Sequence, residues 1–171
     1  MRTLTLIALA ATLVACGQGG GGRSETSASN EACALIADAA TIFGAGAQIV
    51  ANAGEAPIAA VCQFTSADGT RSGEVLLFTA ASMGAIAPAD QLATLAQAWG
   101  AATETPLAPV ENLGDEAQLA TDLPGYQTQI VFRKGQSVIA VLGSSGDAQM
   151  SGEEIARALA SDAAARLPAA G

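Results

Sequence analysis

The segment over residues 128–145 restricts the fold most, because it is apolar on both of its faces. It reads TQIVFRKGQSVIAVLGSS, which predicts two strands that turn at Lys134-Gly135. Successive side chains of a strand point to opposite faces, so the apolar residues Ile130 and Val131 fall on different sides. Strands of this kind are covered on both faces. We therefore expect this hairpin at the centre of a sheet.

A second hairpin is predicted over residues 59–80, which read AAVCQFTSADGTRSGEVLLFTA. Two apolar runs flank Asp68-Gly69, and glycine supplies the positive φ angle that a tight turn needs. A short strand is expected around Ala117–Ala120.

Three helices are expected from apolar periodicity and end signals. The first begins near Glu31, ends at Gly44 and is followed by a glycine- and alanine-rich connection to about Pro57. The second has a proline in its first turn and carries the only tryptophan. The third opens with a capping box, a serine followed three residues later by glutamate. The second and third helices are marked by Pro88, Leu92, Leu95 and Trp99, and by Ser151, Glu154, Ile155 and Leu159.

The order of elements is helix, hairpin, helix, short strand, hairpin, helix. Helices that lie on the faces of an antiparallel sheet form an α+β domain. The expected fold is an antiparallel sheet of two hairpins plus a short strand, with about three helices packed on its faces. Residues 31–168 are long enough for one such domain.

The first sixteen residues predict an export signal and a lipid anchor. Leu4–Ala15 is uncharged and, at twelve residues, falls short of the about 20 that cross a bilayer. It has the length of a signal-peptide core. Leu13-Val14-Ala15-Cys16 resembles the lipobox of bacterial lipoproteins. That resemblance implies that residues 1–15 are removed and that the Cys16 thiol carries a diacylglyceryl group. An ordinary secreted protein and a short transmembrane anchor are the alternatives.

Residues 16–30 are expected to hold the lipidated cysteine and a flexible tether, because GQGGGGRSETSASN after Cys16 lacks large apolar side chains. The protein is then expected in the cell envelope, bound to the membrane by its lipid on the extracytoplasmic side. In that family an aspartate after the cysteine resembles a signal for inner-membrane retention. Gly17 stands there instead, which favours the periplasmic face of the outer membrane if the organism has two membranes.

Cys33 and Cys62 are left once Cys16 is lipidated. An even pair in an oxidising compartment predicts a disulfide, which would join the first helix to the strand that contains Cys62. A redox or metal site of two cysteines is the alternative, although the chain has no CxxC spacing and no histidine.

Composition argues against several kinds of function. The formal net charge is −9, which does not suit nucleic acid binding. Without histidine the commonest general base and metal ligand is missing, and no catalytic, metal or cofactor site is predicted.

Asp115, Glu116 and Asp122 are interpreted as a solvated acidic edge rather than a calcium loop. A pairing of Ser144 with Lys134 stays an open alternative, with Lys134 expected in an exposed turn.

Several features together resemble a group of small bacterial lipoproteins of unknown function with a PsbP-like α/β/α sandwich. They are the lipobox, Cys33 in an early helix, the Cys62-x-Phe64 strand, Gly114-Asp115-Glu116-Ala117, the hairpin FRKGQSVIAV and an alanine-rich last helix. The resemblance implies this fold from Cys33 to Leu167 and brings no catalytic residues.

The predicted function is a non-enzymatic binding or accessory module of the envelope. Its partner would be an envelope protein or a cell-wall component, besides the membrane that holds the lipid on Cys16. The alternative is a carrier of a small apolar or lipid ligand between helices and sheet. An enzyme is a third hypothesis without a candidate nucleophile or base.

Overall fold

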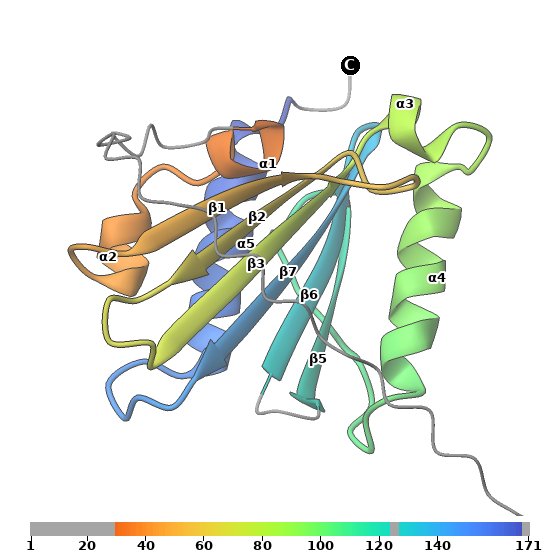
Figure 1. The fold of residues 1–171 in the computed structure, drawn as a ribbon. Coiled ribbons are helices and arrows are strands. Elements are labelled where there is room, and N and C mark those ends of the chain that lie inside the picture. Colours follow the sequence, from red (N-terminus) through yellow and green to blue (C-terminus); the bar gives the residue numbers. More distant parts are fainter. Residues whose placement is uncertain (1–29, 124–126, 169–171) are drawn as a thin grey trace, which may run out of the picture.

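The computed structural model describes residues 30–123 and 127–168, which form a seven-stranded antiparallel sheet with helices on both faces (Figure 1). The predicted α+β class is confirmed. The strands are β1 (Gln48–Ala53), β2 (Ala60–Thr65), β3 (Arg71–Phe78), β4 (Ala108–Pro109), β5 (Glu116–Leu123), β6 (Gln127–Lys134) and β7 (Ser137–Ser145). The helices are α1 (Glu31–Ala34), α2 (Ala39–Phe43), α3 (Ala80–Met83), α4 (Pro88–Gly100) and α5 (Gly152–Arg166).

The sheet joins two meanders in the order β1-β2-β3-β7-β6-β5-β4. β1 to β3 form the first meander and β4 to β7 the second, and the two meet where β3 pairs with β7. Both predicted hairpins are present. The hairpin of β6 and β7 lies at the centre, as its two apolar faces predicted, and turns at Gly135, which has a φ of 58°.

The sheet is larger than predicted. β1 lies in the segment that was expected to be a glycine- and alanine-rich connection, and β4 lies between the second helix and the short strand, where no strand was predicted. β1 has only Ile49 and Val50 as β-branched residues, so its pairing with β2, and not its own propensity, makes it a strand. β5 also extends beyond the short strand expected around Ala117–Ala120.

The helix count was too low, and the first expected helix is two short ones. The Asp38 carboxylate accepts hydrogen bonds from the backbone N–H groups of Ala40 and Thr41 at 3.1 and 3.3 Å, and so begins α2 after a break behind α1. α3 was not predicted. α4 begins at Pro88, and α5 opens with the predicted capping box of Ser151 and Glu154.

One face of the sheet is covered by α1, α2 and α5, and the larger apolar core lies there. α5 lies close to the sheet where β3 and β7 carry paired glycines. A Cβ atom on Gly73 would lie 2.7 Å from Phe43 Cζ and 2.8 Å from Leu159 Cδ1, and one on Gly143 would collide with the Gly152 carbonyl oxygen. Small residues therefore let this helix approach the sheet closely.

A disulfide joins Cys33 of α1 to Cys62 of β2, with the two Cα atoms 5.0 Å apart. This confirms the predicted bond between the first helix and the sheet. Cys62 is fully buried, and Phe64 on the same face stacks on Phe43 of α2 with ring centroids 5.4 Å apart. The bond therefore lies in the main core.

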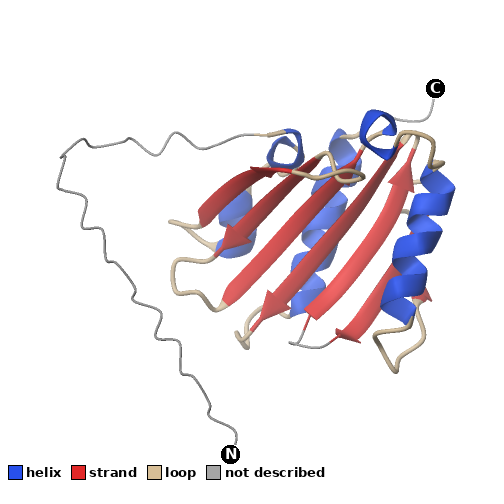
Figure 2. Ribbon diagram, turned by 45° about the vertical axis from the view of Figure 1, so that its right-hand side comes forward, coloured by secondary structure: helices blue, strands red, loops and turns tan. Residues whose placement is uncertain are grey.

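The other face is covered in part. α4 packs over β5, β6 and β7, and a second apolar cluster lies beneath it, with Leu92, Leu95 and Trp99 from the helix and Phe78 and Val138 from the strands. Figure 2 shows α4 on the opposite side of the sheet from α5, while none of the helices in the described residues covers the part of this face over β1 to β3. That uncovered area is where a binding surface can lie.

Candidate functional site

The main candidate site is the uncovered part of the sheet over β1 to β3 together with the adjoining ends of β6 and β7, which line the same hollow. We call this surface the open face. Strand alternation puts one side chain in two from β1, β2, β3, β6 and β7 on it. They include Gln48, Val50, Asn52, Val61, Gln63, Thr65, Ser72, Glu74, Gln127, Leu142 and Ser144.

Five of these residues form one row across five strands, which we call the polar row. In the register of the sheet Gln48 pairs with Thr65, Thr65 with Ser72, Ser72 with Ser144, and Ser144 with Gln127. Neighbouring strands lie about 4.8 Å apart, so the row is about 19 Å long. Every member is a neutral amide or hydroxyl.

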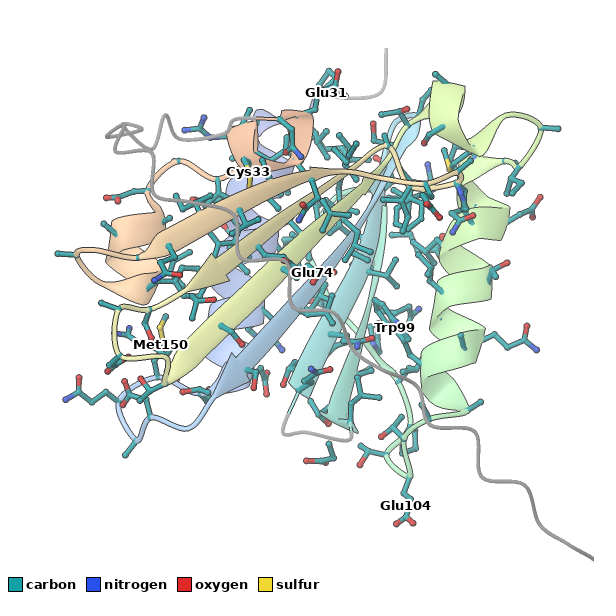
Figure 3. All side chains as sticks on the ribbon, in the orientation of Figure 1. Glu31, Cys33, Glu74, Trp99, Glu104 and Met150 are labelled. Atoms are coloured by element: carbon teal, nitrogen blue, oxygen red, sulfur yellow. A yellow bond between two sulfur atoms is a disulfide. The ribbon has the colours of Figure 1, made fainter. Side chains whose placement is uncertain are left out.

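A second row runs beside it and supplies the only carboxylate of the open face. Gln63 Nε2 donates to Glu74 Oε2 at 2.9 Å, and Leu142 lies opposite Glu74 on β7. Between the two rows is a shallow hollow of about 300 Å³, which residues of both rows line. Figure 3 shows Glu74 over the middle of the sheet.

This arrangement suits a ligand that forms many neutral hydrogen bonds. Amide side chains offer donors and acceptors in fixed directions, and hydroxyl groups can do either. The uncharged polar row neither attracts nor repels an ion strongly. The Glu74 carboxylate beside it can accept hydrogen bonds from hydroxyl groups of a ligand. The open face can therefore bind a polar, uncharged, extended ligand.

Lys134 does not lie in an exposed turn, which corrects the sequence interpretation. Its Nζ donates to the carbonyl oxygen of Ala164 at 2.6 Å, near the end of α5. A cation stabilises the carbonyl groups at a helix C-terminus. Ser144 lies at the other end of the same hairpin and on the other face, so the two do not form a serine–lysine pair.

Several acidic residues of the described part are held by partners of their own. Asp115 accepts from Arg133 and from the Gly135 N–H, both at 2.9 Å. A second hollow lies beside the N-terminus of α5 and contains Asp147 and Glu153. Asp147 lies 3.4 Å from Arg71, and Glu153 accepts from an arginine one helical turn along. Within residues 30–123 and 127–168, no three potential ligands gather as a metal site would require.

Carboxyl groups with lowered pKa values lie at turns and helix caps, away from the open face. The Ser66 hydroxyl and the backbone and side chain of Thr70 donate to Asp68 and lower its pKa to about 2. Hydrogen bonds from Thr41 lower the pKa of Asp38, and bonds from Ser151 lower that of Glu154. Hydrogen bonding to the charged form is the cause in each case. These groups hold local structure.

The residues singled out from the sequence are thus spread over the molecule. Cys33 and Cys62 form the core disulfide, and Trp99 packs between α4 and the sheet (Figure 3). Cys16 and the segments of residues 1–15 and 16–29 lie outside the described residues. None of the helices in the described part of the chain combines the length and the apolar character that a membrane crossing needs.

The polar row was missed by sequence reasoning. Its members come from five strands, and a single glutamine, serine or threonine in a strand is an ordinary solvent-facing residue that suggests no site. The alternation in β2 and β3 was a weak signal, since polar Gln63 and Thr65 alternate with buried Cys62 and Phe64. Only the strand register shows that these positions align.

In comparisons with known proteins, no protein family, no curated protein and no solved structure matches this chain.

Proposed function

We propose that this chain is a lipid-anchored protein of the cell envelope whose domain binds a neutral polymer of the cell wall, without catalysing a reaction. The polar row is the observation that carries this proposal, because it presents uncharged hydrogen-bonding groups along about 19 Å of open sheet. An extended polymer with many hydroxyl groups is the ligand class that such a row fits.

The lipid anchor rests on the lipobox of Leu13 to Cys16. One acyl chain binds a membrane only marginally, and two or three bind it stably. An anchored domain then needs only weak binding sites for a polymer. Many copies of the domain on one membrane can bind the same polymer at once, which raises the overall affinity. A wall polymer close to the membrane meets this condition.

The packing of the domain favours a wall ligand over an apolar ligand carried between helices and sheet. α5 lies so close to the sheet that a Cβ atom has no room at Gly73 or Gly143. The hollow on the open face is lined mainly by polar side chains and is open to solvent. Neither place offers the enclosed apolar volume that a carried lipid needs.

Co-sedimentation of the full chain in detergent with insoluble cell-wall glycan tests the binding. Ser72→Arg places a large charged side chain in the middle of the polar row and should reduce the bound fraction at least tenfold. The matched control is Ser161→Arg, because Ser161 is an exposed serine of α5 on the other side of the sheet. Equal binding by both variants, or no binding by the wild-type chain, would refute the proposed ligand.

The anchor is tested separately with Cys16→Ser. The wild-type chain should be processed, carry added lipid mass and need detergent for extraction. The variant should accumulate unprocessed and without lipid. A mature Cys16→Ser chain that still needs detergent would rule out the lipidated cysteine, whatever the outcome of the binding experiment.

A further inference from the structure

β1 forms an outer edge of the sheet, and its backbone has hydrogen-bonding groups that no described residue uses. In an antiparallel pair of strands, hydrogen-bonded and non-hydrogen-bonded residue pairs alternate. The Ser66 N–H donates to the Arg71 carbonyl, so every second residue of β2, counted from Ser66, turns its backbone groups towards β3. In that alternation Val61, Gln63 and Thr65 turn their backbone groups towards β1. The register of β1 and β2 then leaves the N–H and C=O groups of alternate β1 residues pointing outward. These residues are Ile49, Ala51 and Ala53.

The other edge of the same sheet is protected. β4 has only two residues, Ala108 and Pro109, and proline has no N–H to offer to another strand. Short edge strands and prolines are devices by which proteins prevent unwanted pairing. Among the described residues, the sheet is therefore protected at one edge and has no partner strand at the other.

β1 has none of these devices. It has six residues and no proline, and no charged residue occurs between Asp38 and Glu55. Its two large apolar side chains are exposed on opposite faces, Ile49 by 37% and Val50 by 49%. Among the described residues the only other exposed large apolar side chain is Ile86, at 44%. Two of the three exposed large apolar side chains in the described part therefore lie on this edge.

We infer that β1 pairs with β1 of a second copy of this chain in antiparallel orientation, so that two sheets become one continuous sheet. This inference goes beyond the proposed function and does not depend on it. A copy can approach at this edge despite its like net charge of −9, because the segment between Asp38 and Glu55 has no charged residue that would face its own copy. An antiparallel edge is also complementary to itself about a two-fold axis.

Val50 lies on the two-fold axis, opposite Val50 of the partner copy. The backbone N–H and C=O groups of Val50 point towards β2. Val50 and its copy therefore form a non-hydrogen-bonded pair, the kind of pair in which the side chains are closest. Ile49 then exchanges both backbone hydrogen bonds with Ala51 of the partner subunit. This register buries the most exposed apolar side chain of the edge against its own copy.

The geometry agrees with two chains anchored in one membrane. A two-fold axis perpendicular to the sheet keeps both open faces on one side and both copies of α5 on the other. Asn30, the first described residue, donates from Nδ2 to the Asn52 carbonyl of β1 at 2.8 Å. Both chains therefore enter their domains beside the shared edge, and both polar rows face the same way.

Cysteine cross-linking of the full chain in the cells that express it tests the pairing. Val50→Cys should form a disulfide-linked dimer on mild oxidation, because Cα atoms of non-hydrogen-bonded pairs lie within the 4.4–6.8 Å range of disulfides. Cys33 and Cys62 are bonded to each other, and the wild-type chain run in parallel shows any contribution of Cys16. Ile86→Cys is the matched control and should stay monomeric.

Sedimentation of the full chain in detergent gives the second measurement. The wild-type chain and Ile86→Lys should have the mass of two chains, and Val50→Lys should have the mass of one. A monomeric wild-type chain with no Val50→Cys cross-link would overturn the inference. A dimer that survives Val50→Lys, or a cross-link from Val50→Cys to a different protein, would also overturn it.

Discussion

Replacing Gly143 with alanine should destabilise this domain far more than an ordinary glycine-to-alanine change. An added Cβ would collide with the Gly152 carbonyl oxygen and lie 2.7 Å from the Ala156 nitrogen. Both are backbone atoms of α5, so relief requires the whole helix to move away from the sheet. Overpacking costs 1–3 kcal/mol, and we expect a loss of about 3 kcal/mol in the free energy of unfolding because no side chain can yield.

Urea unfolding of the full chain, followed by fluorescence of Trp99, measures this loss. With a slope of about 2 kcal/mol per molar urea, the midpoint should fall by about 1.5 M. Gly146→Ala is the matched control, because its Cβ would meet nothing nearer than the Thr70 oxygen at 3.9 Å. It should change stability by no more than about 0.5 kcal/mol. Equal stability of the two variants would refute the close approach of α5 and reopen the carrier hypothesis.

Three further predictions concern local structure. Replacing Cys33 and Cys62 together by alanine should lower the free energy of unfolding, measured in urea, by about 3.6 kcal/mol. The disulfide closes a loop of 29 residues and so reduces the entropy of the unfolded chain. An unchanged urea midpoint would contradict this. An NMR titration should find the pKa of Asp68 at about 2, and Ser66→Ala should raise it towards 3.8. Because the folded-state pKa is the lower one, this group stabilises the fold above pH 3.8, and that contribution is lost as the pH falls through about 2. Ser151→Ala should destabilise the domain by about 1 kcal/mol through loss of the α5 cap, and a calorimetric melting temperature equal to that of the wild-type chain would argue against it.

The elements that could be predicted from sequence have strong local signals. The glycine turns at Gly69 and Gly135 marked both hairpins, and Ser151 with Glu154 marked the start of α5. These features depend on backbone conformation within a few residues. The position of the β6–β7 hairpin also followed, because both of its faces are apolar.

The rest depends on contacts between distant parts of the chain. β1 is a strand because β2 lies beside it, and its alanines and amides give little sign of this. Lys134 reads as a turn residue, yet it reaches Ala164, which is 30 positions away. The polar row is defined by strand register alone. Sequence reasoning could therefore give the class of fold but not the surface on which a ligand is expected.

The pairing of β3 with β7 has a consequence for the order in which the domain folds. It joins Arg71 to Ser145 and Phe78 to Val138, so the centre of the sheet forms between segments far apart in sequence. Until β7 has been synthesised, β3 remains an edge strand, and Val75 and its neighbours lack the α5 side of their core. Long-range pairing of this kind slows folding and leaves strand edges exposed to aggregation. The first meander therefore cannot acquire its central neighbour in the sheet before the last third of the chain is available.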